Sequence, residues 1–575
     1  MSTSALTIPV RPERKFLGQD FDCDKWETIE PYLKNLLDRP INSVEDLNHW
    51  LRDQSELETV IGEHSRWIYV RTTVDTTDIH AKEAQAHTYT NIFPKLAPYN
   101  FELDKKFVNS PFLKELDQEL FYTTIRKTKN YVEIFREENV SLQSELNLKQ
   151  SKYDEIIGVQ TISYKGKILT MQQAQALLKS NNRDEREIVF KLMVERRAND
   201  KDALDDLMSE LIKIRHQIAI NAGFRNYTEF RFRELGRFDY TAKDCHDFHA
   251  AAKETVGPVV DEIVAEKKKL LGLEVMLPWD ADAEPASGMP LVPCSSAEDM
   301  LNKTIACFRH LDNYFAERIE IMREMKYLDL DSRVGKGPGG YNMTMPEIGV
   351  PFIFMNAANT EHDLITMVHE GGHAVHTFLA HDQPLNSFKD TPSEIAEVAS
   401  MGMELMTMPY WDEFYKNEAD TKRAQKNHLN YILSLLAKTS LGDAFQHWMY
   451  ANPDHTHQER RNKWRELHKS FTSQVIDYSG YEQDVEVGYQ RIMHFYVVPF
   501  YYIEYAFAEL GAIALYKNFK SDKAKTISAY KSALQLGYTK TIPGFYETAG
   551  VRFDFSLSYI SELVNFVRAE IKSLS

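Results

Sequence analysis

Residues 360–380 read TEHDLITMVHEGGHAVHTFLA, and this stretch decides the fold around the candidate site. Its apolar residues recur every three or four positions, which predicts an amphipathic helix with one buried face. Thr360, followed three positions later by Asp363, matches the capping box that begins many helices. Gly371 and Gly372 each disfavour a helix by about 1 kcal/mol relative to alanine. We therefore expect another backbone to approach them closely, such as the preceding strand or a bound peptide.

The histidines of this helix have the spacing of a metal site. His369 and His373 are one helical turn apart and share a face. Two imidazoles at this spacing can bind one zinc ion, at roughly 2.0–2.1 Å from each nitrogen. Glu370 lies one position further round, where its carboxylate can address a metal-bound water instead of the metal. The motif therefore predicts one zinc ion per chain, with a third protein ligand and an open position for water.

The segment TPSEIAEVASMGMEL, beginning at Thr391, offers acids for that third ligand. Thr391 resembles an N-cap, with Pro392 at the first helical position and Glu394 at the third. This capping box predicts that Glu394 bonds to its own backbone. Glu397 lies almost one turn further on and is expected to complete the metal set. The alternative is that these acids form a solvated helix face.

Two further side chains near the motif have open roles. Glu404 lies seven residues beyond Glu397 on the same face, where it is better placed to hydrogen-bond a metal ligand than to bind the metal. His376 lies three residues past His373. It can orient a ligand, contact substrate, or serve as a hydrogen-bonded core histidine.

Most of the remaining chain has a helical pattern. Apolar spacing predicts helices within 43–66, 170–220, 240–271 and 296–325. Ile348 to Asn356, IGVPFIFMN, is short, apolar and rich in aromatic residues, which predicts a strand. Pro351 has no N–H to donate, and this predicts an edge position for that strand. Residues 277–293 and 335–341 are rich in proline or glycine and are predicted loops.

Composition excludes several classes of protein. The 575 residues are 43% hydrophobic and 27% charged, as in an ordinary folded globular protein. A formal net charge of −17 argues against nucleic-acid binding, which needs a basic surface. The four cysteines lack CxxC spacing, and the sequence shows neither a signal peptide nor a long apolar run. We expect a cytoplasmic protein without a membrane span.

Residues 494–505, HFYVVPFYYIEY, gather one histidine and four tyrosines. A phenol or imidazole donor beside the metal would stabilise the oxyanion that develops during peptide hydrolysis. Tyr502 and Tyr505 are three positions apart and would be neighbours on a helix. Aromatic runs also commonly fill cores, and the pattern alone favours that interpretation.

Three motifs together resemble the thimet oligopeptidase and oligoendopeptidase F family of zinc peptidases, and the oligoendopeptidase F branch most closely. They are HEGGHAVH at 369–376, SEIAEVASMGMEL at 393–405 and HFYVVPFYYIEYAFAE at 494–509. GGYNM at 339–343 is similar to the loop before that family's edge strand. The resemblance implies a mainly helical, two-lobed body with a deep substrate channel. It also implies a small β-sheet beside the HExxH helix, as in the zincin-like catalytic core.

The resemblance also assigns roles to residues. It implies that zinc is bound by His369, His373 and Glu397, and that Glu370 is the general base. It implies that His494 and Tyr505 act on substrate or the oxyanion. Tyr501 and Tyr502 both compete for the place of the family's second tyrosine. We expect an N-terminal helical lobe over residues 1–200 and a catalytic lobe over 201–575, interwoven with it.

The predicted function is zinc-dependent hydrolysis of internal peptide bonds in short oligopeptides. A metal-activated water attacks, Glu370 takes its proton, and Tyr505 with Tyr502 or His494 stabilises the oxyanion. The strand near 350–356 is expected to bind substrate as an added strand. The alternatives are a zinc carboxypeptidase on a similar scaffold and a non-catalytic peptide-binding protein, which the intact Glu370 disfavours. Cleavage preference and oligomeric state stay open.

Overall fold

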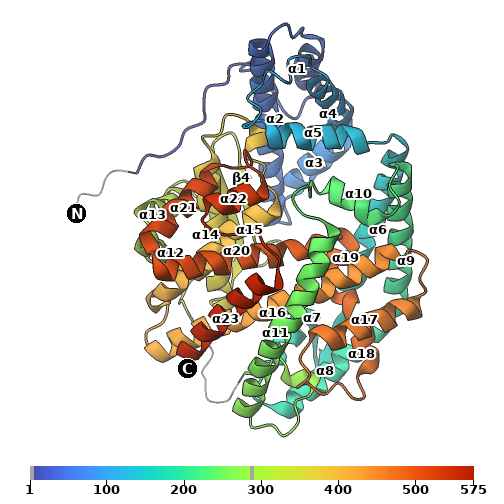
Figure 1. The fold of residues 1–575 in the computed structure, drawn as a ribbon, viewed down its shortest axis with the longest axis vertical. Helices are drawn as coiled ribbons and strands as arrows, with labels where there is room; N and C mark the ends of the chain where they lie inside the picture. The colour runs from blue at the N-terminus through green and yellow to red at the C-terminus, as the bar shows by residue number, and fades with distance from the viewer. Residues whose placement is uncertain (1–5, 285–290, 575) are drawn as a thin grey trace. The chain divides into compact units, whose positions relative to one another are not determined.

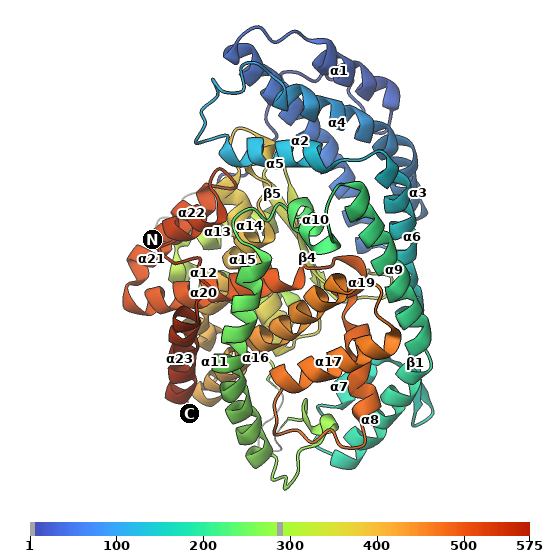
Figure 2. The same cartoon turned by 45° about the vertical axis from the view of Figure 1, so that its right-hand side comes forward.

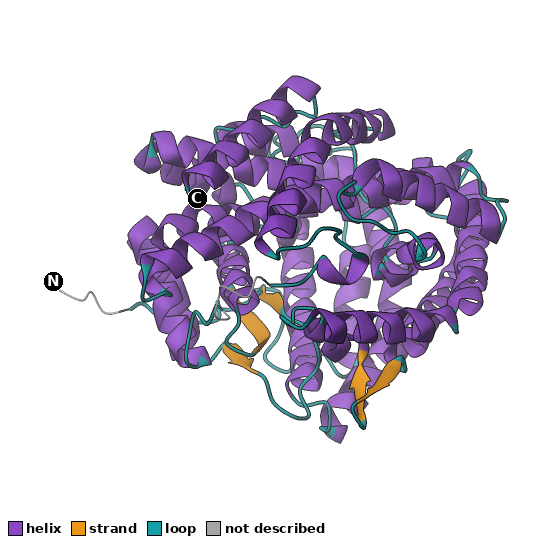
Figure 3. Cartoon of the chain, turned by 90° about the horizontal axis from the view of Figure 1, so that it is seen from below, coloured by secondary structure: helices purple, strands orange, loops and turns teal. Residues whose placement is uncertain are grey.

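The computed structural model describes residues 6–284 and 291–574. Helices account for most of them, and the strands form two small sheets (Figure 3). The predicted mainly helical class with a small sheet is confirmed. Within these ranges, no helix combines the length and the apolarity that a membrane span requires.

The chain divides into two compact units, each assembled from three separate stretches. Unit 1 comprises Met1–Glu133, Leu291–Gln425 and Ala508–Phe553. Unit 2 comprises Ile134–Pro290, Lys426–Phe507 and Asp554–Ser575. The division therefore differs from one placed at residue 200, because the first 200 residues contribute to both units.

Unit 1 carries the following elements, coloured from blue to red along the chain in Figure 1. Its helices and short helical segments are α1 (Trp26–Asp38), α2 (Val44–Val74), α3 (Ile79–His87), η1 (Thr88–Ile92), α4 (Phe93–Val108), α12 (Ala297–Leu311), α13 (Asn313–Glu324), α14 (Glu361–Ala380), η3 (Asn386–Phe388), α15 (Ser393–Thr407), η4 (Met408–Glu413), α21 (Lys523–Gln535) and α22 (Ile542–Thr548). Its strands are β3 (Leu328–Asp331), β4 (Tyr341–Met345) and β5 (Val350–Ala357).

Unit 2 is built from helices and one hairpin. Its elements are α6 (Glu138–Gly158), β1 (Thr161–Tyr164), β2 (Lys167–Thr170), α7 (Met171–Leu177), α8 (Arg183–Ala198), α9 (Lys201–Asn221), α10 (Tyr227–Glu234), α11 (Ala242–Leu270), η2 (Pro278–Asp280), α17 (His457–Phe471), α18 (Glu482–Glu486), η5 (Gly488–Arg491), α19 (Met493–Val497) and α23 (Leu557–Ser573). Three helices contribute residues to both units: α5 (Tyr122–Ile134), α16 (Glu418–Ala451) and α20 (Tyr502–Ser521).

The predicted helical regions all contain helices, and local capping explains where several begin. The Ser296 side chain accepts from the Asp299 backbone at 3.1 Å and so starts α12. The predicted region 170–220 is broken into α7, α8 and α9. The predicted loop 277–293 holds only the short segment η2 among its described residues, and residues 285–290 lie outside the described part of the chain.

The three-stranded sheet of unit 1 has the order β3-β5-β4. Strand β5 pairs in parallel with β3 and antiparallel with β4, so it is central and the predicted edge position is wrong. The missing N–H of Pro351 costs no ladder bond there. Alternate N–H groups of a strand point the same way, and the first donor toward the β3 side is Ile353, which reaches the Tyr327 carbonyl at 3.0 Å. Pro351 precedes that first pair.

The N-terminal helices of unit 1 share a core with a much later stretch. Trp50 on α2 is fully buried, and its indole donates to the Leu36 carbonyl at 2.8 Å. Leu385 and Phe388, around η3, belong to the same apolar cluster. The Phe388 ring meets Phe121 edge-on, with ring centroids 5.1 Å apart. Segments distant in the sequence are therefore needed together to complete this core.

Candidate metal centre

Two helices of unit 1 position the candidate ligands, and a glycine allows the backbones of these helices to come into contact. Helix α14 begins at the predicted capping box, with the Thr360 and Asp363 side chains each bonded to the other's backbone. Helix α15 lies beside it (Figure 1). A Cβ on Gly372 would lie 2.6 Å from the Ala399 carbonyl oxygen, so the two backbones are in direct contact there. The predicted close approach is real, but α15 supplies the backbone and the strand does not.

The other glycine of the motif faces a ring. A Cβ on Gly371 would lie 2.6 Å from the Cζ atom of Phe308 on α12, which is fully buried. The sheet also contacts this helix: β4 and β5 pack beside α14 (Figure 2). Helix α14 therefore packs against the sheet and against α12, α13, α15 and α21, which fixes the direction of its side chains.

The structure brings together the three predicted metal ligands. Glu397 Oε2 lies 3.4 Å from His369 Nε2 and 3.7 Å from His373 Nε2. One donor atom from each residue lies within 4.8 Å of the other two. The two histidine side chains keep about a fifth of their surface exposed, whereas the Glu397 side chain is 10% exposed. Two imidazole nitrogens and a carboxylate oxygen are the donor set that zinc accepts, so these residues fit such an ion.

Further hydrogen bonds orient these side chains. His369 Nδ1 lies 2.6 Å from Glu404 Oε1, and this contact directs Nε2 of the same ring toward Glu397. The Ser400 hydroxyl donates to Glu397 Oε2 at 3.1 Å. Such outer contacts fix the tautomer and orientation of a metal ligand. Glu404 therefore lies where a partner of a ligand is expected.

The electrostatics of the group favour an ionised Glu397. Burial works against the charge, but the hydrogen bond to His369 and the charge of His373 lower the pKa of Glu397 to about 2. Burial lowers the pKa of His373 to about 4, so its imidazole is neutral at pH 7. Burial also opposes protonation of His369, yet its bonds to Glu397 and Glu404 raise its pKa well above the usual value. A cation among these acceptors would balance their negative charge.

Glu370 is held differently from Glu397. It is buried, at 8% exposure, and burial raises the pKa of its carboxyl group to about 7. The Asn342 side chain on β4 donates to its backbone carbonyl at 3.0 Å, which ties α14 to the sheet. A carboxyl group with a pKa near neutrality can both take up and release a proton under physiological conditions.

The predicted aromatic residues lie together in unit 2. The ring centroid of His494 is 5.2 Å from that of Tyr502 and 5.9 Å from that of Tyr505. Burial lowers the pKa of His494 and raises that of Tyr502, so both are neutral at pH 7. A Cβ on Gly442 of α16 would lie 2.7 Å from the Tyr502 ring, so this glycine makes room for the tyrosine.

Comparison with known proteins places the chain in a family. The model of peptidase family M3 matches residues 176–564, and that of the peptidase M3 N-terminal domain matches residues 18–135. The chain belongs to peptidase family M3. It is a metalloendopeptidase, a class whose chemistry needs the kind of donor set described above.

Individual relatives of this M3 peptidase cover between half and nearly all of its length. An oligoendopeptidase F homologue of Borreliella burgdorferi is 22% identical over 93% of this chain and 89% of its own. Oligopeptidase PepF of Bacillus subtilis is 25% identical over 51% of this chain and 43% of its own. A solved structure of PZ peptidase A with an inhibitor is 24% identical, with a TM-score of 0.88 over 97% of this chain and 99% of that one. This last likeness shows a shared fold.

Two predictions about acids and histidines near the motif need correction or completion. Helix α15 of the M3 peptidase begins one residue later than predicted, with Pro392 as an extended N-cap and no side-chain cap, so the predicted Thr391–Glu394 capping box is wrong. The extended backbone of Pro392 (ψ 156°) keeps it out of the first turn. His376 is buried, its Nε2 has no hydrogen-bond partner, and burial lowers its pKa to about 3. It is a neutral histidine in the core.

Sequence reasoning missed Glu509. This acid on α20 is 2% exposed, and burial together with the neighbouring Glu404 carboxylate raises its pKa well above the usual value. Both members of the Glu404–His369 contact therefore influence the charge of Glu509. Its signal in the sequence was a single acid within an otherwise apolar helical run, AFAELGAIAL.

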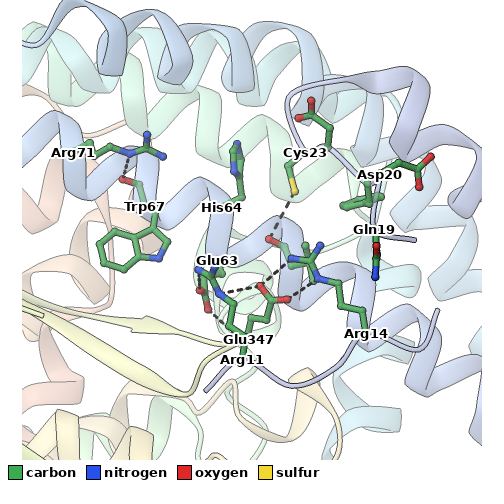
Figure 4. Close-up of a pocket in the computed structure, with 13 residues that line it drawn as sticks. Arg11, Arg14, Gln19, Asp20, Cys23, Glu63, His64, Trp67, Arg71 and Glu347 are labelled. Carbon is green, nitrogen blue, oxygen red and sulfur yellow. Dashed lines mark hydrogen bonds and ion pairs between the residues drawn. The ribbon is translucent and has the colours of Figure 1, made fainter. Parts of the chain in front are cut away.

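Unit 1 of the M3 peptidase also contains a pocket of about 510 Å³ away from the candidate ligands (Figure 4). Arg11 and Arg14 of the N-terminal segment point into it (Figure 4). Arg14 Nε donates to Glu347 at 2.7 Å, and Arg11 Nη2 donates to Glu63 at 2.8 Å. Its charges are thus largely paired within the protein, and its lining includes none of the metal-motif residues.

Proposed function

We propose that this M3 metalloendopeptidase is a zinc-dependent oligopeptidase whose metal is held by His369, His373 and Glu397. The observation that carries the proposal is the convergence of their three donor atoms within 4.8 Å, from two helices in backbone contact. Zinc bound there would polarise the scissile carbonyl and lower the pKa of a water toward neutrality.

Glu370 acts as the general base in this proposal. Its carboxylate accepts a proton from the attacking water and passes it to the leaving amine. The pKa of about 7 that burial gives this carboxyl group suits both transfers. Asn342 and the Gly372 contact hold the backbone of Glu370 in place, and Glu404 positions His369 through Nδ1.

Tyr505 donates to the oxyanion, with Tyr502 or His494 as the second donor. Their mutual ring contacts support this assignment, since the three residues form one cluster of hydrogen-bond donors. Hydrogen-bond donors of this kind are worth about 2.7–4 kcal/mol of transition-state stabilisation each when they reach the oxyanion.

The substrates are short peptides, cut at internal bonds. Strand β5 is paired on both sides, so the added substrate strand expected there has no room along β5. Among the described residues, strand β4 is an edge strand of this sheet, and its Asn342 contacts the backbone of Glu370. We therefore assign backbone pairing of the substrate to β4. We also place the protein in the cytoplasm, a proposal supported by four cysteines that form no disulfide.

The test is Glu370→Gln. This variant should keep the parental zinc content, by elemental analysis, and lose about 100- to 10,000-fold in cleavage of an internally quenched peptide, the range expected for a general base. Glu115→Gln, at an exposed acid of the same unit, should cleave at the parental rate. Retained cleavage by Glu370→Gln would refute the base assignment.

A zinc carboxypeptidase is the rival activity. Mass analysis of products from a ladder of peptides of increasing length separates the two activities. Internal fragments are expected here, with cleavage declining for long chains. Stepwise loss of single C-terminal residues would instead favour the carboxypeptidase.

A further inference from the structure

A second set of metal-binding side chains lies in unit 2, between α11 and α16. Both views show these two helices side by side (Figures 1 and 2). Cys245 comes from α11, and Asp443 and His447 come from α16. All three residues are buried, and one donor atom from each lies within 4.8 Å of the other two. The catalytic ligands meet this same criterion.

The spacing of these residues suits one shared ion. Asp443 and His447 are one helical turn apart and project from the same face of α16. Cys245 and His249 repeat that spacing on α11. In a tetrahedral site with ligand bonds of 2.0–2.3 Å, donor atoms lie roughly 3.3–3.8 Å apart. Small side-chain rotations would bring the three donors to those separations.

The polar atoms of the cluster are incompletely satisfied by the protein. Asp443 is 0% exposed, and its Oδ1 has no hydrogen-bond partner. His447 Nε2 is likewise buried without a hydrogen bond, although it lies 3.2 Å from Asp443 Oδ2. A buried acceptor without a hydrogen bond is unfavourable, and a bound cation would remove that penalty.

The surroundings resemble the outer layer of a metal site. His249 Nε2 lies 2.9 Å from Asp443 Oδ2, so it can donate to the carboxylate and orient it. The rings of Phe232 and Phe500 pack against His447, with centroids 6.0 Å and 5.1 Å away. These two rings give His447 an apolar side, while the exposed His246 ring on α11 lies 4.6 Å from it.

We propose that Cys245, Asp443 and His447 bind a second divalent transition-metal ion, with zinc the best match to the donors. Thiolate, imidazole and carboxylate together select zinc or a close relative over magnesium and calcium, which prefer oxygen ligands alone. Binding releases the proton of the Cys245 thiol to solvent, and no redox step is involved. The ion joins α11 to α16 and serves a structural role in unit 2.

Cobalt substitution tests this site separately from the catalytic one. The catalytic donors contain no sulfur, so only a thiolate site can give the intense thiolate-to-Co²⁺ charge-transfer absorption in the near ultraviolet. Metal-depleted full-length protein, kept reduced with a phosphine and reloaded with Co²⁺, should show this band and bind two equivalents. Absence of the band from the parental protein would overturn the proposal.

Variants assign the band to residues. Cys245→Ser should abolish the charge-transfer band and reduce the bound Co²⁺ by one equivalent. Cys307→Ser, at another buried cysteine, should keep the band and both equivalents of Co²⁺. His373→Ala should lose one equivalent and keep the band, so failure of the catalytic assignment would be seen independently. A band that survives Cys245→Ser would also refute the site. If Cys245→Ser fails to fold, Asp443→Asn should change the shape or intensity of the band and weaken Co²⁺ binding at least tenfold.

Discussion

At the scale of single residues, the structure separates two carboxylates that the sequence presents alike. Glu397 lies against two imidazoles and stays ionised, with a pKa of about 2, while Glu370 is buried and has a pKa of about 7. The difference comes from partners, since both side chains are largely buried. It suits one acid to a cation and the other to proton transfer.

The raised pKa of Glu370 predicts that the free energy of unfolding of the metal-free protein depends on pH. Below the unfolded pKa of about 4.5 the group is neutral in both states and costs nothing. As the pH rises toward 7 the unfolded state ionises first, so stability is lost. Glu370→Gln removes this effect and should raise the free energy of unfolding at pH 8 by on the order of 3 kcal/mol, but not at pH 4.

Urea unfolding of the metal-free parental protein and of the metal-free Glu370→Gln variant, at both pH values, measures that difference. An equal effect of the substitution at pH 4 and pH 8 would show that ionisation of Glu370 is not responsible.

The His369–Glu404 contact predicts a change in metal affinity. Glu404→Ala should weaken zinc binding about 10- to 100-fold, because the Nδ1 partner that orients His369 is lost. Competition with a chromogenic chelator measures the affinity. Glu413→Ala removes the acceptor of His310, at 2.8 Å in the same unit, and should leave zinc affinity unchanged. Equal affinity for both variants would contradict the positioning role.

At the scale of elements, the decisive contact is between α14 and α15 at Gly372. A methyl group there would clash with the Ala399 carbonyl and the Ser400 backbone. Backbone atoms cannot relieve such a clash by changing rotamer, as a side chain can. We therefore expect Gly372→Ala to destabilise the protein by about 1–3 kcal/mol and to weaken metal binding, although alanine favours a helix.

Thermal unfolding and zinc titration check this prediction. Gly158→Ala is the control, since a Cβ at Gly158, on α6, meets nothing within 4 Å. It should change stability by no more than about 1 kcal/mol. If Gly372→Ala behaved like Gly158→Ala, the backbone contact would not be a constraint.

Several elements were predictable because their signals are local. The Thr360 capping box, the helical spacing of His369 and His373, and the strand over 348–356 all appear in short windows of sequence. The edge position inferred from Pro351 was wrong. The inference considered only the missing N–H of one residue, whereas β3 begins to pair with β5 beyond that residue, at Ile353. The capping box at Thr391 was wrong because the backbone of Pro392 is extended and the helix begins one residue later.

At the scale of the whole molecule, each unit is assembled from separate stretches of the chain, and short segments of sequence could not predict this arrangement. Leu385 and Phe388 complete the core of the N-terminal helices, and the Thr123 hydroxyl bonds to the Tyr538 carbonyl. Pairings between such distant segments leave no local pattern. Glu509 was missed for the same reason, because its neighbour Glu404 is remote in sequence.

This organisation predicts that residues 201–575 do not fold alone. The fragment lacks Met1–Glu133, so Leu385 and Phe388 lose their core partners. It should aggregate or unfold without a cooperative transition, whereas the full chain unfolds cooperatively. Circular dichroism during heating and zinc content measure both. A fragment that melts sharply and retains stoichiometric zinc would contradict the prediction.

The same interleaving governs the order of events during synthesis. Unit 1 needs residues as late as Phe553, and unit 2 needs Asp554–Ser575, so neither can be completed until almost all 575 residues have been made. The growing polypeptide must leave the ribosome with apolar surfaces uncovered. Its yield in a cell should accordingly depend on chaperones that hold nascent chains, more than for a protein whose domains mature one after another.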